Sequence, residues 1–258
     1  MSILQELLEG IHYFKTGWSL ISRKGLRRFV VVPVLLNILF LIGLFWIFIT
    51  QIDHQIDTIM TLLPHWLSWV SHILVFFAVA IILLVYYFIF NSLSGFIAAP
   101  FNGLLSEKVE SMLTGEEAND DSIIDMIKDL PRTFKREWLK IWYSLPRIII
   151  LFILGFVPFI GQFIIPVIIF VFTAWSQTIQ YCDYPFDNHK IPFLTMKNAL
   201  KKKPYANFSF GVLVMICTFI PFINFVIIPV AICGATAMWV DNYRQHFITN
   251  KSTGVVEK

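Results

Sequence analysis

The chain has 258 residues, and only 37 of them carry a full charge (20 Lys or Arg and 17 Asp or Glu). A soluble protein is about a quarter charged, so roughly 64 charged residues would be expected at this length. In addition, 57% of the residues are hydrophobic, and 26 are Phe. This composition excludes an intrinsically disordered chain, a nucleic-acid module and a disulfide-rich secreted scaffold.

The charged residues leave four long stretches that contain no Asp, Glu, Lys, Arg or His. A bilayer core about 30 Å thick is crossed by about 20 helical residues, so each stretch is long enough to be a membrane element. The alternative is a set of buried helices in a soluble protein, but a chain of this length cannot bury four such segments. The stretches are 29–51, 73–106, 148–182 and 204–240.

The N-terminal segment, 1–28, is predicted to begin with an amphipathic helix over 3–21. Apolar residues recur every three or four positions from Ile3 to Ile21, with Glu6, Glu9 and Lys15 on the opposite face. This pattern is typical of a helix that lies in the membrane interface.

A basic motif of Gly25, Leu26, Arg27 and Arg28 directly precedes the first apolar stretch. Unpaired N–H groups at a helix start and two guanidinium groups suit a tetrahedral oxyanion, so the motif predicts an anion site. The site is expected at the wet interface, because a few charged hydrogen bonds cannot offset full burial of a dianion. The alternative is a basic cluster that only sets membrane topology.

The basic residues are distributed unevenly around the first two apolar stretches, predicted as span 1 (29–51) and span 2 (73–106). The segment between them, 52–72, contains no Lys or Arg, whereas 107–147 contains seven. Under the positive-inside rule 52–72 is external. The same rule places four segments in the cytoplasm, and with them both termini: 1–28, 107–147, 183–203 and 241–258.

The last two apolar stretches contain nearly the same sequence at their centres. Residues 157–167 align without a gap to 220–230, with seven of eleven positions identical and both prolines in register. Proline interrupts a helix, and Gly161 or Asn224 can take the positive φ of a turn. Each stretch is therefore predicted to be a helix, a turn and a second helix.

Both ends of each of these stretches are predicted to be cytoplasmic, so the chain must return within hairpin 1 (148–182) and hairpin 2 (204–240). The limbs have about 12 to 19 residues, at or below the minimum for a span. Short tilted spans and re-entrant hairpins both fit. The predicted fold is an all-α integral membrane protein with an interfacial helix, two long transmembrane helices and two Pro-broken hairpins, forming one membrane domain over 1–258.

The sequence contains no pattern of catalytic or metal-binding residues. Its six His are scattered, its three Cys form no paired motif, and no Walker loop, nucleophile elbow or HExxH is present. We therefore expect no enzyme activity, no cofactor and no metal. Neutral polar groups in the apolar stretches could still line a path for an ion. They are Asn37, Asn91, Ser92, Ser94, Asn102, Gln162, Ser176, Gln177, Gln180, Asn207 and Asn224.

The chain resembles the CysZ family of bacterial inner-membrane sulfate permeases over nearly its whole length. The resemblance rests on the Gly25–Arg28 motif, on Ala-Pro-Phe-Asn at 99–102 followed by Glu-Lys-Val-Glu at 107–110, and on the two Pro-Phe-Ile hairpins. It implies sulfate uptake into the cytoplasm for cysteine synthesis, by a homodimer or larger homo-oligomer whose hairpins only partly penetrate the bilayer. It also implies that sulfate binds at Gly25, Leu26, Arg27 and Arg28.

The sequence leaves two alternatives for the transport mode and two for the function. Family members are described as proton-dependent, yet the apolar stretches contain no titratable group. Coupling could use interfacial residues such as Glu107 or Glu110, or transport could be channel-like. The alternative function is a membrane scaffold without transport, whose basic clusters bind anionic lipid or a partner protein.

Overall fold

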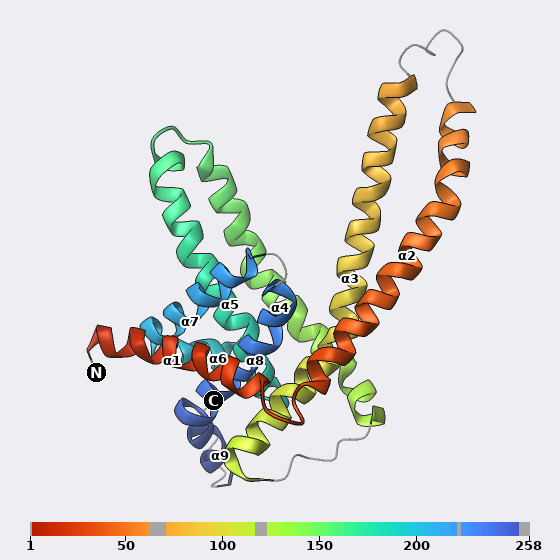
Figure 1. Cartoon of the computed structure of the whole chain (residues 1–258). Helices are drawn as coiled ribbons and strands as arrows, with labels where there is room; N and C mark the ends of the chain where they lie inside the picture. The colour runs from red at the N-terminus through yellow and green to blue at the C-terminus, as the bar shows by residue number, and fades with distance from the viewer. Residues whose placement is uncertain (1, 62–70, 117–122, 221–222, 253–258) are drawn as a thin grey trace. The chain divides into compact units, whose positions relative to one another are not determined.

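The computed structural model describes residues 2–61, 71–116, 123–220 and 223–252, and every regular element in these ranges is a helix (Figure 1). Helix α1 is Ile3–Ile21, α2 is Arg28–Thr61, α3 is Ser71–Thr114 and α4 is Ile123–Gly155. A short π-helix, Ile160–Ile164, precedes α5 (Ile165–Asn188). The remaining helices are α6 (Phe193–Leu200), α7 (Pro204–Thr218), α8 (Ile223–Asn242) and α9 (Arg244–Ser252).

The chain divides into two compact units. The smaller unit is Val31–Phe101, which contains most of α2 and α3. The two helices run antiparallel, because Phe40 stacks on Phe90 while the later Phe48 meets the earlier Tyr86, with ring centroids 5.8 and 5.4 Å apart. Many large apolar side chains of this unit are exposed, Trp46 by 72%, as expected of a surface that faces lipid. Residues 62–70 of the predicted external segment lie outside the described ranges.

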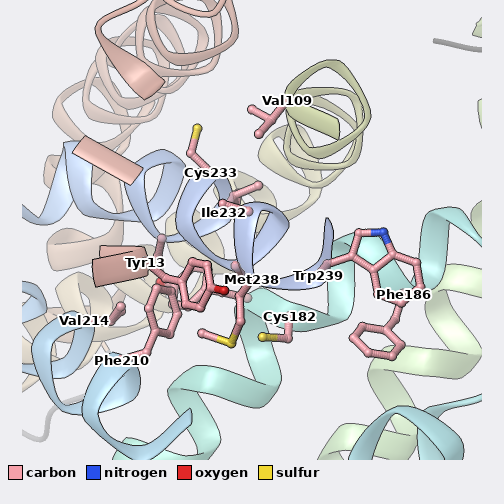
Figure 2. Close-up of a cluster of buried hydrophobic side chains, with 14 of the residues drawn as sticks. Tyr13, Val109, Cys182, Phe186, Phe210, Val214, Ile232, Cys233, Met238 and Trp239 are labelled. Carbon is pink, nitrogen blue, oxygen red and sulfur yellow. The ribbon is translucent and has the colours of Figure 1, made fainter. Parts of the chain in front are cut away.

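The larger unit, Met1–Val30 with Asn102–Lys258, is built around α8. The residues from Val230 to Trp239 are all buried, and α1, α5 and α7 pack around them. Figure 2 shows part of this core, in which Phe186 meets Trp239 with ring centroids 4.5 Å apart. The predicted interfacial helix over 3–21 is confirmed as α1, and its N-terminus is closed by a capping box between Ser2 and Gln5.

Glycines allow these helices to approach closely. A Cβ atom on Gly10 of α1 would clash with the carbonyl oxygen of Ala206 on α7, and one on Gly211 would clash with that of Ala174 on α5. The buried amide nitrogen of Asn207 is paired: it donates to the carbonyl oxygens of Leu200 and Lys203, at 2.7 and 2.9 Å. Asn207, one of the neutral polar candidates of the sequence, therefore belongs to the core.

Hairpin 1 has longer limbs than the sequence predicted. Its limbs are α4, with 33 residues, and α5, with 24 residues, because both helices continue into charged sequence. The charged side chains are accommodated as buried ion pairs: Asp183 binds Arg136 at 2.7 Å and Lys140 at 3.1 Å. The predicted limb length of 12 to 19 residues is therefore wrong for this hairpin, since paired charges allow a helix to extend beyond its apolar part.

The turn of hairpin 1 differs in detail from the prediction. The positive φ falls on Phe159 (65°), and Gly161 lies in the short π-helix instead. Gly161 serves close packing, because a Cβ atom there would clash with the carbonyl oxygen of Gly155. The side chain of Phe159 is 77% exposed at the end of the hairpin.

Hairpin 2 is formed by α7, with 15 residues, and α8, with 20 residues. Its limbs are short, as the sequence suggested. Residues 221–222 of its turn, including the first repeated proline, lie outside the described ranges. Asn224 lies within α8. Although the two hairpins share their central sequence, α8 is buried in the larger unit, whereas large apolar side chains of α4 and α5 are exposed.

Three helical segments in the described residues are long and apolar enough to cross a membrane: Val31–Gln51, Pro131–Gly155 and Ile160–Asn188. The first corresponds to the predicted span 1, and the other two belong to hairpin 1. Val75–Phe90, Pro204–Thr218 and Val226–Asn242 are shorter apolar segments. The protein is thus an all-helical membrane protein, and whether hairpin 2 and α3 cross the bilayer stays a prediction.

Candidate functional site

The predicted anion motif lies in the turn between α1 and α2. Helix α1 ends at Ile21, and the turn is formed by backbone hydrogen bonds from Leu26 N to the Arg23 oxygen, at 3.3 Å, and from Phe29 N to the Leu26 oxygen, at 3.0 Å. Gly25 has a φ of 99°, which a residue with a side chain rarely adopts. A Cβ atom at Gly25 would meet nothing within 4 Å. The backbone conformation therefore favours glycine here, and the space above it is open.

The other three residues of the motif have different surroundings. Leu26 is fully buried and fixes the turn to the core of the larger unit. Arg27 is exposed, and its Nε and Nη2 donate to the Ser22 carbonyl oxygen at 3.2 and 3.0 Å. Arg28 is exposed, with its guanidinium carbon 5.0 Å from the ring centroid of Phe29. The turn thus orients two guanidinium groups while leaving them accessible.

The turn is strongly basic. Arg23 and Lys24 are also exposed, which gives four basic side chains within six residues. The sequence contains no Asp or Glu between Glu9 and Asp53, so no carboxylate from this part of the chain neutralises them. Guanidinium groups bind oxyanions through paired N–H donors, so the turn can recognise a small oxyanion at the protein surface.

The second predicted pair, Glu107 and Glu110, lies one helical turn apart on α3. Glu107 is half-buried and Glu110 is buried. Both carboxylate oxygens of Glu110 lie within hydrogen-bonding distance of His189 Nε2, at 2.8 and 2.9 Å. Arg244 Nε donates to Glu110 at 2.8 Å and also pairs with Glu116. This group, called here the Glu110 cluster, joins α3 to the end of α5 and the start of α9.

The pKa of Glu110 reflects two opposing effects. Burial alone raises the pKa of its carboxyl group, but the hydrogen bonds and charges of His189 and Arg244 outweigh burial and hold the pKa below its ordinary value. Glu110 is therefore ionised at neutral pH. His189 also stacks on Trp239, with ring centroids 5.2 Å apart. The cluster is consequently a well-ordered junction between helices.

The predicted site residues form two separate groups, because the guanidinium of Arg27 donates to the turn itself and Glu110 binds His189 and Arg244. Sequence reasoning missed His189 and Arg244 as partners. They are 79 and 134 residues from Glu110, and no local spacing connects them. Among the described residues, no group of three or more His, Cys, Asp or Glu is arranged to hold a metal ion.

These features define a class of protein: an integral membrane protein of apolar helices with an exposed basic turn directly before its first candidate span. The sequence profile described as "Sulfate transporter CysZ/Etoposide-induced protein 2.4" matches residues 13–229. A curated protein of Pectobacterium atrosepticum, "Sulfate transporter CysZ", is 52% identical over 235 residues, which are 91% of this chain and 86% of that protein. The chain belongs to this family. The resemblance found in the sequence is thereby confirmed, and the curated relative is a transporter, not an enzyme.

Proposed function

We propose that this protein carries sulfate across the bacterial inner membrane into the cytoplasm, where it supplies cysteine synthesis. The observation that carries the proposal is the basic turn at Gly25–Arg28, in a chain that is 52% identical to a curated sulfate transporter. Sulfate presents four oxygens to hydrogen-bond donors, and the exposed guanidinium groups of Arg27 and Arg28 offer planar pairs of N–H donors. The turn would recognise sulfate before it enters the membrane.

The exposure of this turn suits recognition better than tight capture. A charged hydrogen bond contributes about 1.5–3 kcal/mol, whereas full burial of an unpaired charge costs tens of kcal/mol. Sulfate bound at an exposed turn keeps part of its hydration, so the site can release it. This property is needed in a transporter, in which binding must be strong enough to select the ion and weak enough to release it.

The Glu110 cluster argues against Glu110 itself as a proton carrier. A proton carrier must gain and lose a proton near the working pH, but the lowered pKa of Glu110 keeps its carboxylate ionised there. We infer that Glu110 anchors α3 to α5 and α9, and that sulfate moves down its own electrochemical or consumption gradient. Sulfate flux into liposomes would then be insensitive to an imposed pH gradient.

The sulfate site is tested by isothermal titration of the purified protein in detergent. Arg27→Ala and Arg28→Ala should each weaken sulfate binding roughly 10- to 100-fold, because each removes one charged donor group. Lys202→Ala is the matched control, since it removes one exposed positive charge from the loop before α7. Unchanged affinity in both arginine variants, with wild-type melting temperatures, would exclude the site at Gly25–Arg28.

The scaffold alternative is tested by flux of radiolabelled sulfate into liposomes that contain this protein alone. Transport predicts uptake well above that of empty liposomes. A scaffold whose basic clusters bind anionic lipid predicts no uptake, together with binding to anionic vesicles that Arg27→Ala weakens. A homo-oligomer is expected from the family resemblance, and its mass is measured in the same preparation by light scattering.

A further inference from the structure

A partly open cavity of about 560 Å³ lies between the two limbs of hairpin 1. One side of it is formed by Thr173, Ser176, Gln177 and Gln180 of α5, which share one helix face at spacings of three and four residues. Ser144 contributes a further hydroxyl from α4. The remaining lining is apolar, so the polar groups form a single row along a hydrophobic wall.

Within the described part of the chain, the five polar side chains of this row lack a protein partner. Among the residues that the structure describes, none of them makes a side-chain hydrogen bond, and the hydroxyl of Ser176 is shut off from solvent as well. Buried polar groups in proteins are nearly always paired, so the shielded, unpaired hydroxyl of Ser176 points to an occupant that hydrogen-bonds. The other four side chains are half-buried and line the same cavity, so they can contact that occupant as well. A lipid chain would leave these groups unsatisfied and is therefore a poor occupant.

The cavity carries no net charge of its own. Its lining includes no acidic or basic residue. The nearest charged residues along the helices are Arg147, three residues after Ser144, and Asp183, three residues after Gln180. Arg147 is exposed and donates to the Tyr143 carbonyl oxygen, and Asp183 pairs with Lys140 at 3.1 Å. The donors that face the cavity are thus neutral hydroxyl and amide groups, and no carboxylate lines it to repel an anion.

We propose that this cavity is a transit site where sulfate passes hairpin 1, held by the hydroxyl and amide donors of Ser144, Thr173, Ser176, Gln177 and Gln180. The proposal rests on the proposed function. A hydroxyl supplies one donor and a primary amide two, so the row can replace part of the hydration shell of sulfate. At roughly 30 Å³ per water molecule, the cavity also has room for sulfate with several retained waters, which lowers the desolvation cost.

Neutral donors give this site a different role from the basic turn. Fixed cations at membrane depth would hold a dianion too tightly for release, whereas hydroxyl and amide groups bind it weakly. Arg27 and Arg28 would therefore select sulfate, and the polar row would bind it transiently as it passes hairpin 1. The two sites predict separable phenotypes, because a change in the row should slow transport without weakening binding at the turn.

The test measures radiolabelled sulfate flux into liposomes and sulfate affinity by titration for the same preparations. Gln177→Leu and Gln180→Leu should each lower the flux about tenfold, with affinity unchanged. Gln245→Leu is the matched control, because it makes the same substitution at an exposed position of α9 that does not line the cavity, and it should leave the flux unchanged. Thr173→Val and Ser176→Ala serve as smaller changes if a leucine variant fails to fold.

A substitution that introduces a negative charge into the cavity gives a stricter test. Gln177→Glu is nearly isosteric and introduces a carboxylate, so it should lower sulfate flux further than Gln177→Leu does. Wild-type flux in Gln177→Leu, Gln180→Leu and Gln177→Glu would overturn the transit site while leaving the proposed function intact. A change of oligomer mass that accompanies the lost flux would overturn it too, because the row would then be a contact between copies. Absence of flux in the wild-type protein would instead overturn the proposed function itself.

Discussion

At the scale of single residues, the charges that the fold buries are paired across long distances in the chain. Glu110 illustrates this arrangement. Its carboxylate is almost completely removed from solvent, yet it receives hydrogen bonds from His189, directly after α5, and from Arg244, at the start of α9. Because an unpaired buried carboxylate would be strongly destabilising, these contacts fix α3 against the ends of α5 and α9.

The Glu110 cluster predicts a specific pH dependence of stability. Because the folded protein lowers the pKa of Glu110 from 4.5, the cluster stabilises the folded state fully above about pH 4.5 and loses this contribution as the pH falls through the folded pKa. Glu110→Gln should therefore be less stable than wild type at pH 7, by about 1–3 kcal/mol, and this difference should shrink in acid. Thermal unfolding in detergent at several pH values measures it.

Glu116→Gln is the control for this prediction, because Glu116 pairs with the same Arg244 from an exposed position. Its stability should stay close to wild type at all pH values, since exposed ion pairs contribute little. If the loss in Glu110→Gln were the same in acid as at neutral pH, Glu110 would not be the titrating group. The geometry of the cluster could not be predicted from the sequence, although the sequence did indicate Glu110 as a candidate residue.

At the scale of helices, hairpin 1 combines an apolar part with a charged base. The Arg136 guanidinium is buried, donates to Asp183 at 2.7 Å and lies 3.1 Å from Asp187. It also donates to the Ile191 carbonyl oxygen, which lies in the turn between α5 and α6. One side chain of α4 therefore fixes both the end of α5 and the chain that follows it.

Removal of this side chain should destabilise the protein markedly. Arg136→Met keeps an apolar stem of similar reach but leaves Asp183 and Asp187 short of a partner, and breaking a buried pair in this way costs about 3–5 kcal/mol. The expected result is a large drop in melting temperature in detergent. Lys135→Met is the matched control, since Lys135 is exposed on the same helix and should have little effect. Equal melting temperatures for the two variants would contradict a stabilising role for Arg136.

A comparison of predicted and observed helices shows which sequence patterns gave the correct bounds and which did not. The periodicity of 3–21 predicted α1 with its bounds, because an amphipathic pattern reports directly on one helix. The charge-free limits of hairpin 1 predicted lengths for α4 and α5 that are too short, because the sequence pattern does not show that Lys140 and Asp183 neutralise each other. Ser176, Gln177 and Gln180 were recognised as polar candidates, and helical spacing from them also indicates Thr173.

At the scale of the whole molecule, the sequence predicts which loops face the cytoplasm. Two cysteine variants test this topology in a background that lacks Cys182, Cys217 and Cys233. His54→Cys, in the predicted external segment, should react with an impermeant thiol reagent in intact cells. Lys202→Cys, in the predicted cytoplasmic loop 183–203, should react only after the membrane is permeabilised.

The labelling result tests whether the chain returns to the cytoplasm within hairpin 1. Reaction of Lys202→Cys in intact cells would mean that 148–182 crosses the bilayer once and does not return. It would also arise if copies of the chain insert in both orientations, in which case His54→Cys would be only partly labelled. The positive-inside rule predicts one orientation, because 52–72 has no basic residue and each flanking segment has several.

The sequence by itself determined the helical membrane class, the interfacial helix, the repeated Pro-Phe-Ile segments and the basic turn. These are local properties, set by hydropathy, helical periodicity and charge along neighbouring residues. Only the tertiary structure decided that α8 is buried while much of hairpin 1 is exposed, that Glu110 meets His189 and Arg244, and that five polar side chains share one cavity. Such contacts join residues far apart in the chain, and the packing that forms them leaves no local pattern in the sequence.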